Sequence, residues 1–135
     1  MSERYDGGTW SLLLPVGWRG RQEDELDQLF GPDDVGAMTI SAAFKDSEVL
    51  ESDLRDFAAE HLEAGAKASP ARCGDFVGFE IAFRDDDAFW RLWYLRNGRQ
   101  MLFVTYSCDF DARGVEDDAI REALASLVAQ ESDLT

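Results

Sequence analysis

Basic residues are scarce in this chain. Among its 135 residues, 13 are lysine or arginine and 28 are aspartate or glutamate, so the formal net charge is -15 at pH 7. A field of this sign repels phosphate backbones, and we therefore exclude nucleic acid as a partner. The same field would favour a basic protein partner or a cation, although an acidic surface can also serve solubility alone.

Long apolar runs are also absent. No stretch is long enough to cross a membrane, and the N-terminus lacks the basic start and apolar run of a signal peptide. We therefore expect a cytoplasmic protein without a membrane span. Its hydrophobic content of 45% and aromatic content of 12% indicate one folded domain over residues 1–135, with a frayed tail at 131–135.

Residues that hold metals or carry out catalysis are few. The chain has one histidine, His61, and two cysteines, Cys73 and Cys108, which at these spacings do not form a zinc ligand set. Residues 109–114 are similar to half of a calcium loop, but Arg113 stands where an oxygen ligand is required. No phosphate-binding glycine loop is present. We expect no metal, no cofactor and no catalytic residue.

Apolar residues recur along the chain at two spacings, one typical of strands and one typical of amphipathic helices. The segment 19–36 is the least decided, and its apolar spacing allows a short helix. The order of elements predicts an α/β fold of the α+β type, with a mainly antiparallel β-sheet flanked by helices. The expected strands span 9–14, 37–44, 75–84, 89–96 and 99–108, the expected helices span 50–62 and 115–130, and 67–72 is expected to be a loop.

The most informative stretch consists of two apolar runs on either side of Asn97 and Gly98. An Asn-Gly pair in this position is the strongest short-range signal for a hairpin with a type I′ turn. With these two residues as the turn, Tyr94 lies opposite Met101. The two faces of the hairpin are then defined, and both are largely apolar.

The loop before this hairpin decides which side chains share a face. A three-residue loop at 85–87 would place Arg91 among apolar side chains, where an unpaired charge is costly. A four-residue loop at 85–88 places Trp90 beside Phe83 instead, and we predict this register. The first face, expected to be the core beneath the two helices, then holds Val77, Phe79, Ile81, Phe83, Trp90, Leu92, Tyr94, Met101 and Phe103.

The second face of the sheet is apolar with a few charges set in it. An exposed apolar patch of this size usually marks an interaction site, whereas a covering helix would make it part of a three-layer sandwich. Three alternatives are open: the segment 19–36 and the N-terminal strand cover this face, a second copy pairs with it, or a partner binds it. For partner binding the candidates are Arg91 as the polar contact and Phe89, Trp93, Leu102, Val104 and Tyr106 as apolar anchors.

Several motifs resemble the PsbP-like α/β/α sandwich superfamily. They are Leu-Pro-Val-Gly-Trp at 14–18, the glycine-bearing strand at 78–80, the Asn-Gly hairpin and the closing amphipathic helix. The superfamily includes extrinsic proteins of photosystem II, a Ran-GTPase release factor and effector-associated chaperones of bacterial type VI secretion. Length and the opening motif are most similar to the chaperones. The resemblance implies protein binding, in the chaperones of apolar client helices held on the sheet.

The leading hypothesis is a non-catalytic, cytoplasmic protein-binding protein of chaperone, adaptor or immunity type. Its partner would be a basic protein or one that offers an apolar helix. The alternative is a small-ligand-binding protein or hydrolase-like enzyme with a pocket near His61 or Trp18. Homodimerisation through the second face is a third hypothesis.

Overall fold

The computed structural model describes residues 3–24 and 26–130, so the tail expected at 131–135 lies outside the described residues. Within this part of the chain, all strand pairs are antiparallel and form a seven-stranded and a three-stranded sheet. The predicted class, a mainly antiparallel α+β fold, is confirmed. The large sheet runs in the order β3 (Arg19–Glu23), β4 (Leu26–Phe30), β5 (Gly36–Phe44), β9 (Gln100–Asp109), β8 (Ala88–Asn97), β7 (Phe76–Asp85) and β6 (Ser69–Cys73).

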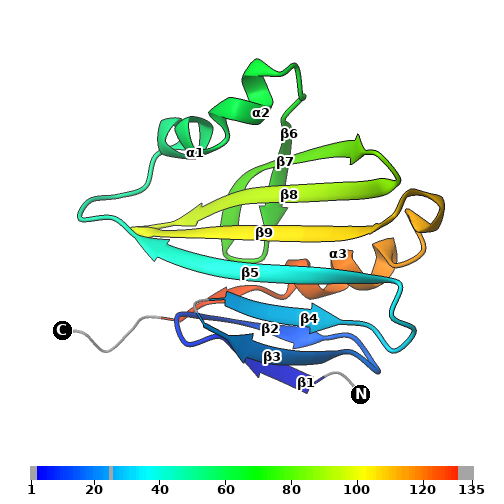
Figure 1. Cartoon of the computed structure of the whole chain (residues 1–135). Coiled ribbons are helices and arrows are strands. Elements are labelled where there is room, and N and C mark those ends of the chain that lie inside the picture. Colours follow the sequence, from blue (N-terminus) through cyan, green and yellow to red (C-terminus); the bar gives the residue numbers. More distant parts are fainter. Residues whose placement is uncertain (1–2, 25, 131–135) are drawn as a thin grey trace.

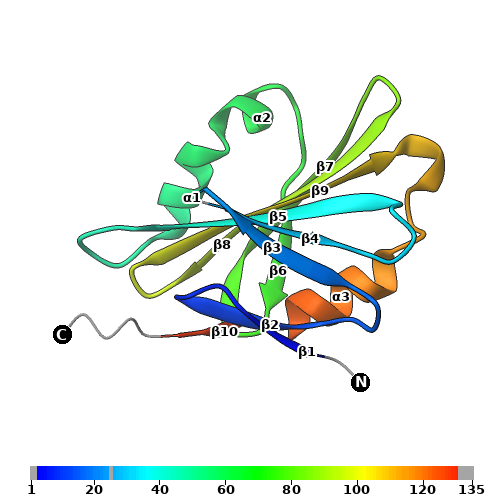
Figure 2. The ribbon, with the colours of Figure 1, turned by 60° about the horizontal axis from the view of Figure 1, so that its bottom comes forward.

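Elements lie on both faces of the large sheet (Figure 1). The helices α1 (Glu51–Phe57) and α2 (Ala59–Glu63) pack on one face. The helix α3 (Asp117–Ala125) and the small sheet pack on the other, as the turned view also shows (Figure 2). The small sheet has the order β1 (Glu3–Asp6), β2 (Trp10–Leu14) and β10 (Val128–Ala129). A short 3-10 helix, Phe110–Ala112, joins β9 to the chain that leads to α3.

The segment 19–36 forms the hairpin β3–β4 rather than a helix. Leu29 lies opposite Met38 of β5, and both side chains are fully buried. This pairing with β5 outweighs the helical spacing of the apolar residues, because all five residues of β4 find long-range partners in β5. The expected loop at 67–72 is also wrong in part, since β6 forms there. Pro70 is tolerated because β6 is an edge strand.

The last helix, expected over 115–130, is shorter than predicted. It ends at Ala125, and Val128 then lies opposite Ser11 of β2 in a two-residue strand. The C-terminal segment therefore ties the small sheet to α3 and closes the structure below the large sheet.

The two hairpins of the meander test the predicted register. Phe83 lies opposite Trp90, so the predicted pairing of β7 with β8 is confirmed. In β8–β9 the turn lies at Gly98 and Arg99, and Tyr94 lies opposite Phe103 rather than Met101. Gly98 has φ +59°, as the first central residue of a type II′ turn requires. Because this shift moves each partner by two residues, it leaves the membership of the faces unchanged.

The relative burial of the two faces is the reverse of the prediction. The second face forms the larger core, beneath α3 and β2, with Trp93, Leu95 and Leu102 fully enclosed. The first face is covered only in part by α1 and α2, and its side chains Phe83, Trp90, Met101 and Phe103 are half-buried. The two expected helices thus cover different faces, since each supplies one apolar stripe.

A polar bond joins the two sheets. The hydroxyl of Tyr5 in β1 donates a hydrogen bond of 2.7 Å to Oδ1 of Asp27 in β4. Burial raises the pKa of Asp27 above its usual value, and the bond from Tyr5 lowers that pKa by less. In the window between the unfolded and the folded pKa, the folded chain binds more protons, so stability is lost as pH rises through it.

Asp27→Asn is therefore expected to raise the melting temperature at pH 7. The amide oxygen still accepts a hydrogen bond from the Tyr5 hydroxyl, while a buried charge, whose hydrogen-bond partner is this neutral hydroxyl, is removed. We expect the gain over the natural chain to shrink below about pH 4, where the carboxyl of the unfolded chain is also protonated. Melting curves at pH 3 and pH 7 measure this gain in melting temperature. A gain of equal size at both pH values would contradict the view that the buried charge of Asp27 destabilises the fold.

Candidate functional site

The six residues nominated for partner binding lie on the covered face. Trp93 is 3% exposed, and Leu102, Val104 and Tyr106 are equally enclosed. Phe89 is half-buried against the same core and contacts Phe110 at a centroid distance of 6.3 Å. A partner cannot reach these four buried side chains in the folded chain, so their assignment as exposed anchors is wrong. The physical reason is the cover supplied by α3 and β2, which bury their own apolar stripes against this face.

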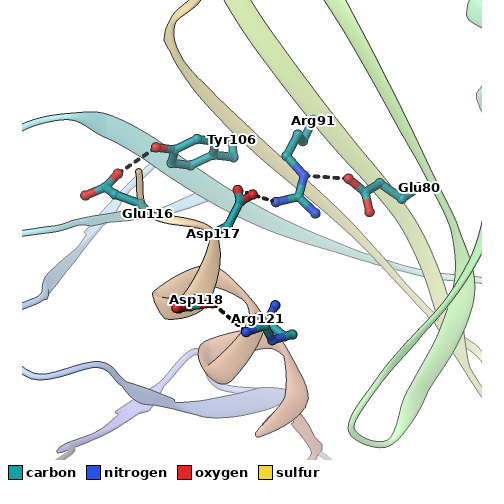
Figure 3. Close-up of polar contacts among 7 residues, drawn as sticks. All are labelled: Glu80, Arg91, Tyr106, Glu116, Asp117, Asp118 and Arg121. Carbon is teal, nitrogen blue, oxygen red and sulfur yellow. Dashed lines mark hydrogen bonds and ion pairs between the residues drawn. The ribbon is translucent and has the colours of Figure 1, made fainter. Parts of the chain in front are cut away.

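Arg91, the nominated polar contact, fastens α3 to the sheet (Figure 3). Its Nε donates to Oε2 of Glu80 in β7 at 2.5 Å, and its Nη1 donates to Oδ1 of Asp117 at 3.2 Å. The guanidinium also stacks over Trp93, 4.6 Å from a ring centroid. Because its guanidinium pairs with two carboxylates and only 21% of its side chain is exposed, Arg91 has a structural role here.

A small cavity of about 310 Å³ lies beside this ion-pair cluster and includes Cys73 in its lining. Burial, with a smaller contribution from Glu80, raises the pKa of Cys73 to about 11. The thiol is therefore protonated at neutral pH and is a poor nucleophile. Both cysteines are free, and Cys108 lies at the opposite end of the meander from Cys73.

His61 lies on α2 and does not line the cavity beside Cys73. Its ring stacks on Phe83 at a centroid distance of 5.1 Å. Within the described residues, none of the hydrogen bonds between side chains includes the imidazole, so it lacks the partner that orients a general base. In the same part of the chain, no group of three or more His, Cys, Asp or Glu residues is arranged to hold a metal ion.

The larger cavity is a groove of about 700 Å³, a size in the range of about 300–1,000 Å³ that ligand pockets have. It lies where the end of β2 meets α3. Figure 2 shows these two elements beside one another on the same face of the large sheet. Three segments distant in sequence form it: the end of β2 with the turn after it, the loop between β4 and β5, and residues 115–126, which include α3 and both of its ends. Its apolar lining is Leu13, Pro15, Val16, Trp18, Pro32, Val35, Val115, Ala119 and Ala125.

The turn after β2 explains the Leu-Pro-Val-Gly-Trp motif. The amide of Trp18 donates to the carbonyl of Pro15 at 3.0 Å, and Gly17 has φ +84°. A type II turn needs a positive φ at its third residue, so glycine is required there. The turn presents Val16 to solvent, where it is 70% exposed, and directs Trp18 inward, where it is 8% exposed.

A buried carboxylate lies in the lining of this groove. Glu116 is 8% exposed, and its Oε1 accepts a hydrogen bond of 2.6 Å from the Tyr106 hydroxyl (Figure 3). Burial, and secondarily this bond, raises the pKa of Tyr106, so the phenol stays a proton donor. Three further carboxylates, of Asp33, Asp118 and Glu122, line the groove. Among the lining residues the structure describes, none is basic.

Tyr106→Phe is expected to lower the free energy of unfolding by about 1–2 kcal/mol. The ring and its packing stay, but the carboxylate of Glu116 loses its side-chain donor, and a buried acceptor without a donor costs about 1–3 kcal/mol. Urea unfolding followed by circular dichroism measures the loss. In the Glu116→Gln background the same change should cost less, and equal costs in both backgrounds would contradict a charge-assisted bond.

The sequence contains the exposed aliphatic residues of the groove, but it does not show that they lie close together in the fold. Val115 precedes the last helix and is 66% exposed, and Val16 is at the tip of the first turn. Exposed aliphatic residues at turns and helix starts are an indication of surface contact when they converge. Their convergence depends on the docking of α3 beside β2, which no local pattern predicts.

Comparisons with known proteins give the fold. No family model and no curated protein matches the chain. A solved structure from Bacteroides thetaiotaomicron VPI-5482 is similar with a TM-score of 0.68 and 17% identity, over 96% of this chain and 48% of that chain. LpqN of Mycobacterium tuberculosis, involved in cell envelope biogenesis, is similar with a TM-score of 0.61 and 15% identity, over 97% and 91% of the two chains.

This chain therefore spans about half the length of the Bacteroides protein and most of LpqN. At these identities the likeness shows a shared fold alone. No helix among the described residues is long and apolar enough to span a membrane.

Proposed function

We propose that this chain is a non-catalytic protein-binding domain of chaperone or adaptor type, acting in the cytoplasm, and that it holds its partner in the groove between β2 and α3. The observation that carries the proposal is the convergence of three exposed aliphatic side chains, Leu13, Val16 and Val115, on one cavity. Aliphatic surface exposed at 38–70% is unfavourable in water and is typical of interaction sites when it is contiguous.

The resemblance to the PsbP-like sandwich supports the same proposal, because its members mostly bind proteins. The proposed contact differs from the one expected on the sheet of the type VI secretion chaperones. In this chain the corresponding apolar face packs against α3 and β2, so the groove at their junction is the surface we propose instead.

The test is a photo-crosslinking experiment in the source organism. A photoreactive phenylalanine analogue replaces Val16 in the groove, or Leu50, an exposed aliphatic residue beside α1 on the opposite face. We expect a discrete protein adduct, identified by mass spectrometry, from position 16. The adduct should be lost when Val115→Asp is added.

Two results would overturn the proposal. One is the absence of any polypeptide adduct from position 16 in a chain that melts at the natural temperature. The other is an adduct from position 50 alone, which would place the partner on the half-covered face beside α1. Adducts only with a second copy of the chain would mean that the groove serves homodimerisation rather than an adaptor role.

A further inference from the structure

Glu116 is a buried carboxylate whose charge is not matched by a basic group. Its partner in the structure is the neutral hydroxyl of Tyr106, and no ion pair within residues 3–24 and 26–130 includes it. A buried charge is costly unless it is paired. Its Oε1 accepts the bond from Tyr106, and within the described residues Oε2 accepts no side-chain hydrogen bond, so Oε2 can pair with a cation that enters the groove.

The surroundings of Oε2 leave room for this approach. A Cβ built on Gly31 would overlap Oε2 of Glu116 and would lie 3.1–3.2 Å from the indole of Trp18. The absence of a side chain at residue 31 thus lets the carboxylate and the indole lie close together beside the groove. A carboxylate pairs with an ammonium or guanidinium group, and the face of an indole attracts the same cations, so the two groups together are a favourable setting for a basic side chain.

The other charged residues that line the groove are negative, as Glu116 is. Asp33 and Glu122 line the groove without an ion pair in the described part of the chain, and Asp118 pairs with the exposed Arg121. Together with the net charge of -15, these groups create a negative potential in which a cationic segment is attracted and an anionic one is repelled.

We infer that the groove takes a protein segment that carries both aliphatic and basic side chains, with one lysine or arginine of the partner paired to Glu116 beside Trp18. The aliphatic side chains of the segment pack on Val16 and Val115. This inference rests on the proposed function and specifies its partner chemistry. The apolar lining of the groove provides contact area, and the charge of Glu116 favours a basic partner over a neutral or acidic one.

The test measures binding of three short synthetic peptides by fluorescence anisotropy at low and physiological salt. One is an amphipathic peptide of leucine and lysine, the second has glutamate in place of lysine, and the third has serine in place of leucine. We expect binding of the leucine–lysine peptide only, with an affinity that decreases as salt rises. Equal binding of the glutamate peptide would overturn the inference, as would equal binding of the serine–lysine peptide.

Matched variants separate the site from the overall charge. Glu116→Gln keeps the acceptor for Tyr106 but removes the charge, and we expect binding of the leucine–lysine peptide to be at least about tenfold weaker. Asp56→Asn removes one negative charge from an exposed position on α1 and should leave the affinity unchanged. Equal effects of the two variants would overturn the inference, because the attraction would then come from net charge alone.

Gly31→Ala provides a variant without any change of charge. The added Cβ displaces the Glu116 carboxylate, so binding of the leucine–lysine peptide should weaken, with a fall in melting temperature no larger than that expected for Tyr106→Phe. Failure of these peptide tests with a crosslink still formed at position 16 would refute the basic partner and leave the proposed function standing. Loss of the crosslink would refute the proposed function itself.

Discussion

Trp93→Ala is expected to lower the free energy of unfolding by about 3–5 kcal/mol, the range for deletion of a buried tryptophan. Trp93 is 3% exposed and lies in the core between the sheet, α3 and β2. Its removal leaves a cavity that the neighbouring elements cannot fill, and it also removes the surface on which Arg91 stacks. Since small domains are stable by about 5–15 kcal/mol, this loss brings the chain close to unfolding.

The matched control is Trp90→Ala, three residues earlier on the same strand and on the opposite face. Trp90 is half-buried and stacks on Phe83 at a centroid distance of 6.4 Å, so less contact is lost. Urea unfolding followed by far-ultraviolet circular dichroism compares the two, because fluorescence would change with either substitution. A larger loss at Trp90 than at Trp93 would place the main core beside α1.

The sequence predicted which side chains share a face but not which face is the more enclosed. Successive side chains of a strand point to opposite faces of the sheet, so Trp93 and Trp90 lie on different faces of β8 regardless of what packs against each face. The cover comes from the two ends of the chain, β2 and α3, through contacts that no local pattern encodes. A clue lay in β5 and β9, where the first face includes Thr39 and Thr105 opposite one another.

The segment 19–36 shows the limit of periodicity in short elements. Leu26, Leu29 and Phe30 are spaced as on a helix, but in β4 they fall on alternate faces, with Leu29 enclosed and the other two half-buried. A helix of this length gains little from its own hydrogen bonds. The strand gains a partner on each side, β3 and β5, and extends the sheet.

The groove was beyond prediction for a similar reason. The sequence indicated a strand end at Pro15 and a helix start near Glu116, and both are confirmed within a few residues. Their adjacency follows from the docking of α3 on the second face, which is fixed by the bonds of Arg91 and Tyr106 to residues at the start of α3. Two of the residues predicted to contact a partner, Arg91 and Tyr106, thus hold α3 in the position that forms the groove and do not line the groove themselves.

Gly78→Ala is expected to destabilise the chain by about 3 kcal/mol, the upper part of the range for overpacking. Gly78 lies within β7, between β6 and β8, and a Cβ at this position would overlap the carbonyl oxygen of Tyr94. The obstacle is backbone, so it cannot rotate away as a side chain would. Relief requires β7 and β8 to separate, which breaks ladder hydrogen bonds at the centre of the meander.

Ala82→Val is the control on the same strand, since Ala82 is exposed and the larger side chain extends into solvent. Surface substitutions of this kind usually change stability by less than about 0.5 kcal/mol, and a β-branched residue suits a strand. Urea midpoints at a constant slope report the difference between the two variants. A midpoint for Gly78→Ala equal to that of the natural chain would show that β7 and β8 can part without cost, and would remove the close backbone approach as the reason for glycine at residue 78.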